Sequence, residues 1–113
     1  MAAADRPVYL QLRDRIAEAI LEGRYHEGDM LPSVRAFAAE QGANPLTVAK
    51  AYQLFQEEGL VVVKRGVGMF VADGATRRLL ERERNAFINE EWPRIRQVIE
   101  RLQIDVSELF ARV

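Results

Sequence analysis

The chain has 113 residues, of which 49% are hydrophobic, and its 16 basic and 17 acidic side chains give a net charge of −1. This length accommodates one compact domain with a short appendage, and the apolar content excludes wholesale disorder. The absence of cysteine excludes disulfides and thiolate metal sites, and no apolar run approaches membrane-spanning length, so the expected location is the cytoplasm.

The first predicted helix begins near Pro7, because proline suits the first helical turn, and Gly23 is its natural stop. Apolar residues recur at helical spacing and predict one buried stripe along this helix, made of Val8, Leu12, Ile16, Ala19 and Ile20. The polar segment that follows, residues 24–29, is expected to be a loop.

Two short helices are predicted next, with a very tight connection between them. Ser33 can cap the first through its hydroxyl, and Gly42 ends it. Asn44 and Pro45 form the N-cap and first position of the second, which Gly59 closes. Its predicted buried face consists of Val48, Ala51, Tyr52 and Phe55, opposite Phe37 and Ala38 of the preceding helix. Helices this close must cross steeply, which is the geometry of a helix-turn-helix.

Two β-prone runs, residues 60–64 and 69–71, flank a basic, glycine-containing tip. Gly66 and Gly68 suit a hairpin turn that needs positive φ angles. A hairpin placed directly after a helix-turn-helix completes the plan of a winged helix-turn-helix. The predicted fold class is therefore mostly α with a small β-hairpin, and residues 1–74 are the expected DNA-binding domain.

Residues 75–113 are expected to form a short two-helix dimerisation tail. The pattern is helical from Thr76 to Leu102 with an interruption at Pro93, and Asp105 to Glu108 resembles a capping box that opens a last helix. Two helices cannot hide their apolar stripes within such a tail and are expected to pack either on the first domain or on a second copy. The second copy is favoured, because a single helix-turn-helix reads too few base pairs to be specific. The predicted dimerisation residues are Leu80, Phe87, Ile88, Ile95, Val98, Ile99, Leu102, Leu109 and Phe110.

Candidate DNA contacts come from the helix-turn-helix and the hairpin tip. The first turn of the second helix meets base edges and phosphates in such folds, and its N-terminus attracts phosphate. The predicted set is Arg35, Asn44, Pro45, Leu46, Thr47, Lys50, Lys64, Arg65 and Gly66. The alternative is that Asn44 only caps its helix and Lys50 is a solvated lysine. The acidic balance of residues 1–75 means that attraction to DNA must come from basic side chains gathered on one face.

The residues do not predict catalysis or a bound metal. His26 is the single histidine, and the sequence offers it no converging set of partners. No phosphate-cradling glycine loop and no nucleophile–base pair stands out. We expect no enzyme activity, no metal and no cofactor.

Three segments carry a family resemblance: PVYLQLRDRIAEAILEGRY, GDMLPSVRAFA and NPLTVAKAYQLFQEEGLVVVKRGVGMFV. Residues 7–72 resemble the DNA-binding domain of the GntR family of bacterial transcription regulators, and the short tail resembles the YtrA-like subfamily. The resemblance implies a homodimeric repressor on a palindromic DNA operator. The family's contacts then fall on Arg35, Asn44 to Thr47, Lys50, Arg65 and Gly66.

Three positions depart from the family pattern. Glu27 replaces a frequent proline, Ala36-Phe37 replaces a frequent Glu-Leu, and Leu46 stands where a polar residue is common. An apolar residue at position 46 favours contact with a thymine methyl over a hydrogen bond. The sequence identifies no small-molecule effector, which would have to use a dimer-interface cavity or act indirectly. The competing hypothesis is a winged-helix protein-interaction module, since the fold alone does not determine function.

Overall fold

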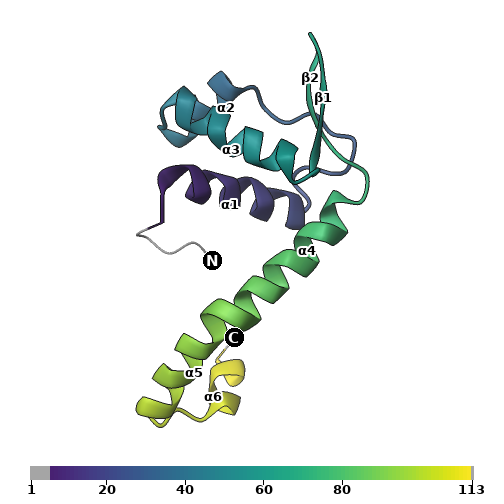
Figure 1. Cartoon of the computed structure of the whole chain (residues 1–113). Coiled ribbons are helices and arrows are strands. Elements are labelled where there is room, and N and C mark those ends of the chain that lie inside the picture. The colour runs from purple at the N-terminus through teal and green to yellow at the C-terminus, as the bar shows by residue number, and fades with distance from the viewer. Residues whose placement is uncertain (1–5, 113) are drawn as a thin grey trace. The chain divides into compact units, whose positions relative to one another are not determined.

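The computed structural model describes residues 6–112, which divide into two compact units with the boundary between Leu80 and Glu81. Figure 1 labels the helices and strands along the chain. The first unit contains α1 (Val8–Leu21), α2 (Val34–Gln41), α3 (Pro45–Glu57), β1 (Val61–Lys64), β2 (Gly68–Val71) and the start of α4 (Ala75–Ala86). Within it, α3 packs against α1, α2 and β1.

The helix boundaries follow the predicted capping residues. The Ser33 hydroxyl accepts a hydrogen bond from the backbone N–H of Ala36 at 3.1 Å, which caps α2. The Asn44 side chain accepts one from the N–H of Leu46 at 2.8 Å, which caps α3. Gly42 ends α2 in the left-handed conformation, with φ of 61°. These caps confirm the predicted helix-turn-helix.

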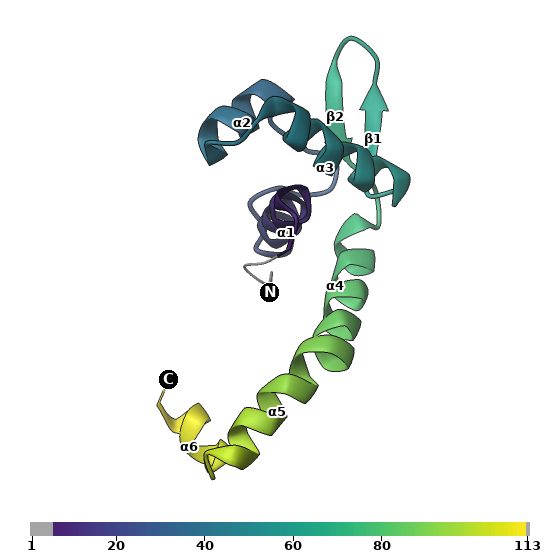
Figure 2. The same cartoon turned by 60° about the vertical axis from the view of Figure 1, so that its left-hand side comes forward.

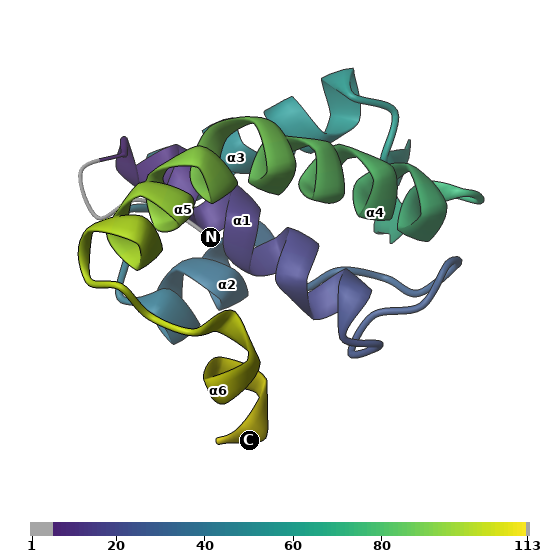
Figure 3. The same cartoon turned by 90° about the horizontal axis from the view of Figure 1, so that it is seen from below.

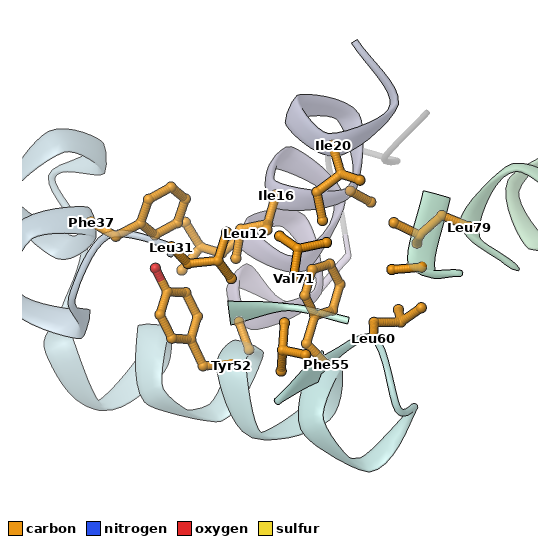
Figure 4. Packing of buried hydrophobic residues seen from close by; sticks show 14 of the residues in the cluster. Leu12, Ile16, Ile20, Leu31, Phe37, Tyr52, Phe55, Leu60, Val71 and Leu79 are labelled. Atoms are coloured by element: carbon orange, nitrogen blue, oxygen red, sulfur yellow. The ribbon is translucent and has the colours of Figure 1, made fainter. Parts of the chain in front are cut away.

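The core of the first unit lies between α1, α3 and the base of the hairpin (Figure 4). Side chains from every element of this unit meet there, among them Leu12, Phe37, Phe55 and Leu79. The predicted buried face of α3 is confirmed in full. The prediction for Val8 is wrong, because its side chain is 56% exposed. Val8 is the first residue of α1, and the buried part of that helix begins only at Leu12.

The predicted hairpin is confirmed as an antiparallel pair in which Val61 lies opposite Val71 and Lys64 opposite Gly68. Figure 2 shows this hairpin extending away from the helices, with its turn at the far end. Gly66 in the turn has φ of 77°, a conformation that L side chains rarely adopt. The segment before α2 runs beside β2, since Met30 forms an isolated bridge with Phe70.

The second unit contains the rest of α4, a π-helical turn η1 (Phe87–Glu91), α5 (Trp92–Arg101) and α6 (Val106–Ala111). Figure 3 shows α5 ending in a loop that leads to the short α6. The predicted interruption at Pro93 is confirmed, because the π-helical turn directly precedes α5, where Pro93 occupies the first turn. Proline lacks the N–H that a regular α-helix requires, so the backbone changes its hydrogen-bond spacing here.

Asp105 caps α6, as predicted, but its partner differs from that of the expected capping box. Its carboxylate accepts hydrogen bonds from the backbone N–H and the hydroxyl of Ser107, at 3.0 and 2.7 Å. These bonds hold the pKa of Asp105 below its ordinary value. No residue of η1, α5 or α6 is buried among those described.

Candidate nucleic-acid interface

The first turn of α3 presents an exposed surface at the start of the second helix of the helix-turn-helix. Asn44, Pro45 and Leu46 are exposed, and Leu46 is 80% accessible although it is apolar. Thr47, the other predicted contact in this turn, is half-buried. An apolar side chain that is this exposed is suited to contact with the methyl group of a thymine.

The exposed face continues along α3 beyond the predicted residues. Ala49, Lys50 and Gln53 are exposed, and Gln53 follows Ala49 by four residues and Lys50 by three, on the side opposite the buried Val48 and Phe55. Gln53 was not among the predicted contacts, although its amide suits hydrogen bonding to adenine in the major groove. The seven-residue spacing from Leu46 is a signal in the sequence that places both side chains on one face.

Lys50 is exposed but not free of neighbours. Its ammonium nitrogen lies 4.0 Å from the centroid of the Tyr9 ring of α1. This is a cation–π contact, which directs the charge toward α1. The predicted contacts on α3 are therefore not a uniform set, since Lys50 has a structural partner and Leu46 has none.

Arg35 and Arg65 are exposed, and neither forms an ion pair with another residue of the described range 6–112. Arg35 lies at the second position of α2, and Arg65 lies in the hairpin turn. The two segments approach each other, because Ser33 and Val34 line the same cleft as Arg65. The structure thus brings the start of α2 and the hairpin turn to one side of the unit.

Lys64 lies next to Arg65 but is oriented differently. Its ammonium nitrogen lies 4.5 Å from the centroid of the Phe70 ring, on the strand opposite. Lys64 therefore belongs to the hairpin face that carries Val62 and Phe70, whereas Val63 and Met69 form the other face. Of the two basic residues predicted at the hairpin tip, Arg65 has the less constrained charge.

Glu27 has a structural role that the sequence did not predict. Its carboxylate accepts hydrogen bonds from the backbone N–H of Gly74 at 2.8 Å and of Thr76 at 3.4 Å. The Gly74 bond has the largest effect on the pKa of Glu27 and lowers it; desolvation opposes this, but the bonds to Thr76 and the charge of Arg78 add to it, so the pKa lies below its ordinary value. This departure from the family pattern therefore joins the loop after α1 to the start of α4.

The described residues contain no group of three or more His, Cys, Asp or Glu side chains that could hold a metal ion. His26 is exposed and lies 3.5 Å from Asp29 through its Nδ1 atom. Within residues 6–112, no helix combines the length and apolar character needed to cross a lipid bilayer.

Comparison with known proteins yields regulators of transcription. The model of the gntR family of bacterial regulatory proteins matches residues 8–71, more than half of the chain. The HTH-type transcriptional repressor YtrA of Bacillus subtilis (strain 168) is 40% identical over 75 residues, which are 66% of this chain and 58% of that protein. This chain thus spans about three fifths of the length of that curated relative.

Two solved structures extend the comparison. A transcriptional regulator from Oenococcus oeni has a TM-score of 0.73 and 31% identity, with 97% of this chain and 96% of that chain covered. The complex of AraR(DBD) with operator ORX1 has a TM-score of 0.58 and 25% identity, with 64% and 87% covered. The first covers both units of this chain, and the second was solved with its operator.

Proposed function

Because this chain belongs to the gntR family of bacterial regulatory proteins, we propose that it is a transcription regulator that binds double-stranded DNA sequence-specifically and represses nearby promoters. In this proposal the first turn of α3 enters the major groove, and the hairpin turn contacts the neighbouring backbone. The observation that carries the proposal is that the side chains of Leu46 and Arg65 are both exposed. One offers an apolar contact to a base and the other an unpaired charge to a phosphate.

The proposal assigns the remaining predicted residues of the first unit to supporting contacts with DNA. Arg35, Asn44, Pro45 and Thr47 position the module on the backbone, with the Asn44 amide group left to donate while its oxygen caps α3. Apart from its two chain neighbours, Gly66 has no atom of another described residue within 4 Å of the place where a side chain would begin, so its backbone is open to a sugar-phosphate strand. Lys50 and Lys64 contribute positive charge, and each ammonium group lies over an aromatic ring.

The proposal includes a homodimer that reads a palindromic operator from the cytoplasm. A single helix-turn-helix contacts too few base pairs for specific recognition, and a two-fold dimer doubles the site. Large apolar side chains of the tail are exposed, with Phe110 at 76% and Leu102 at 62%. The expected contact set also contains exposed Leu80, Phe87, Ile88, Val98 and Leu109 and half-buried Ile95 and Ile99. Trp92 and Val106 are exposed as well and extend the predicted set.

Replacing Arg65 by alanine tests the role of the wing in DNA binding. Loss of one charge-assisted contact in each protomer is expected to weaken binding of the dimer to the preferred site by about 3–6 kcal/mol, at about 1.5–3 kcal/mol per contact. The slope of log affinity against log salt should become less steep by about 1.8, the contribution of two phosphate contacts. Fluorescence anisotropy with a labelled duplex, repeated over a series of salt concentrations, measures both quantities.

Arg77→Ala is the matched control for this experiment. Arg77 is also an exposed arginine of the first unit, but it lies in α4, which follows β2 at the base of the hairpin. The control should leave affinity and salt slope close to those of the unmodified protein. Equal effects of the two substitutions would mean that net charge, and not the wing, governs DNA binding. No effect of either would contradict the proposed contact.

A further inference from the structure

The first unit contains a cleft of about 440 Å³ between the hairpin and the segment that leads into α2. Clefts that bind small molecules commonly measure roughly 300–1,000 Å³ and have mostly apolar walls. Hydrogen bonds hold both walls in place, since the N–H of Leu31 donates to the Met69 carbonyl oxygen at 2.8 Å and that of Val71 to Asp29 at 2.9 Å. The cleft is therefore built into the fold of a single unit.

Apolar side chains form the walls of this cleft. Met30 and Val34 line it from the segment before and at the start of α2, and Val63 and Met69 line it from one face of the hairpin. Tyr52 forms the floor with its ring, because its hydroxyl already donates to the Pro32 carbonyl oxygen at 2.7 Å. The side chains named here leave no free polar group inside, which favours an apolar ligand body.

The charged residues at the edge of the cleft all have the same sign. Lys64 and Arg65 line it, and no acidic residue does. The Lys64 ammonium group lies over Phe70, on the opposite face of the hairpin. Arg65 has no ion pair within the described chain and can reach an anion at the mouth of the cleft. An apolar wall beside one unpaired guanidinium is complementary to an apolar body with a single negative charge.

We propose that this cleft binds a small amphipathic carboxylate, with its hydrocarbon part between Val63, Met69 and Tyr52 and its carboxylate on Arg65. The binding site itself does not depend on DNA. Its regulatory consequence rests on the proposed function, because Arg65 and Gly66 are also the proposed wing contacts with the operator. A carboxylate paired with Arg65 removes the charge that the phosphate backbone would meet, so ligand and operator compete.

The three methionines of the chain provide a direct probe of the site. Met69 lines the cleft from the same face of the hairpin as Val63, so ¹³C-methyl labelling of methionine places a reporter in it. Titration with octanoate, below its micelle-forming concentration, should shift the Met69 signal along a saturable curve. Octan-1-ol has the same apolar body without the charge and should bind more weakly by roughly tenfold, the expected loss of one charge-assisted pair.

Val63 and Val62 offer a matched pair of variants. They are adjacent in β1 and similarly exposed, at 46% and 49%, but they lie on opposite faces of the hairpin. Val63→Trp fills the cleft and should abolish the saturable shifts. Val62→Trp adds the same bulk outside the cleft and should leave them unchanged. Equal behaviour of the two variants would show that octanoate binds apolar surface non-specifically and would overturn the proposal.

The other outcomes are equally decisive. Absence of saturable methyl shifts with octanoate overturns the site, and equal affinity for octanol overturns the carboxylate assignment. Equal shifts produced by inorganic phosphate at matched ionic strength would reassign the cleft to a phosphate group. In a separate measurement, octanoate should lower the affinity of the unmodified protein for its selected duplex but not that of Val63→Trp. If octanoate shifts the methyl signals but does not lower DNA affinity, the site is retained and its link to DNA is overturned. If neither the unmodified protein nor Val63→Trp binds DNA, only the proposed function is refuted.

Discussion

Replacing Leu79 by alanine tests whether the first turns of α4 belong to the core of the DNA-binding unit. Leu79 is 0% exposed and lies in the same cluster as Phe55 and Leu60. Burial of a leucine contributes about 1.5–3 kcal/mol, and the cavity left by Leu→Ala raises the measured loss to about 2.7–5.0 kcal/mol. We expect a loss near the low end of this series, about 3 kcal/mol.

Urea unfolding followed by circular dichroism measures this loss. With a slope of about 1–3 kcal/mol per molar urea, the midpoint should fall by about 1–3 M. Leu80→Ala is the matched control, because Leu80 is the adjacent residue of α4 but is 48% exposed. It should leave the unfolding of the first unit nearly unchanged, while sedimentation equilibrium shows weaker self-association. Several protein concentrations are needed so that dissociation and unfolding are separated.

Two results would refute this reasoning. A loss below about 1 kcal/mol for Leu79→Ala, the size expected for an ordinary substitution, would mean that α4 does not complete the core. Equal losses for both variants would mean that the two leucines have the same environment. If the reasoning holds, a fragment ending at Gly74 should be less stable than one ending at Leu80, because the shorter one lacks Ala75 and Leu79.

Two further predictions concern the hairpin turn and the loop after α1. Gly66→Ala should destabilise the chain by about 1–2 kcal/mol in urea unfolding, because φ at Gly66 is positive and no nearby side chain of the described residues could offset the strain by packing on the new methyl group. Gly66→Asn should lose less stability, because asparagine tolerates this conformation better. Equal stability of the alanine variant and the unmodified protein would exclude this strain. The pKa of Glu27 is lowered in the folded state, so its contribution to stability is present above its ordinary value of 4.5 and is lost as the pH falls through the folded value. The stability difference between the unmodified protein and Glu27→Gln should therefore shrink on acidification, and a difference that is constant with pH would contradict the role of its charge.

Local signals in the sequence were sufficient for the helix-turn-helix and the wing. The capping hydrogen bonds at Ser33, Asn44 and Gly42 join residues that are only a few positions apart in the sequence. The apolar face of α3 likewise follows from the spacing of residues within that helix. Capping and periodicity are properties of short segments, which explains why these elements and their boundaries could be predicted.

Contacts between distant segments were beyond such reasoning. Buried Arg13 of α1 lies 3.2 Å from Glu58 and 5.5 Å from the centroid of the Phe55 ring, and buried Asp14 is paired with Arg6. Nothing in a helical stripe indicates that charged residues beside it are buried, because Arg13 is covered by the distant Glu58 and Phe55, while Asp14 pairs with both Arg6 and Arg13. The contact of Lys50 with Tyr9 and the bonds of Glu27 to the start of α4 have the same origin.

The candidate site was predicted in type but not in detail. The residue types at the start of α3 and in the hairpin turn indicated DNA contacts, and the structure shows which of them have other partners. Leu46 and Arg65 are exposed without such a partner that would compete with DNA, whereas Lys50 and Lys64 lie over aromatic rings. Gln53 lies beyond the first turn of α3, from which all predicted contacts on that helix except Lys50 come, although its position on the exposed face follows from helical spacing alone.

Selection of bound duplexes from a random-sequence pool tests the central claim most directly. A two-fold dimer that reads DNA through α3 should enrich an inverted repeat whose half-site centres are separated by about one helical turn, roughly 10 base pairs, or a multiple of it. The selected site should lose affinity when the base pairs facing Leu46 are changed. No enriched sequence, or enrichment of a single half-site without symmetry, would contradict the account.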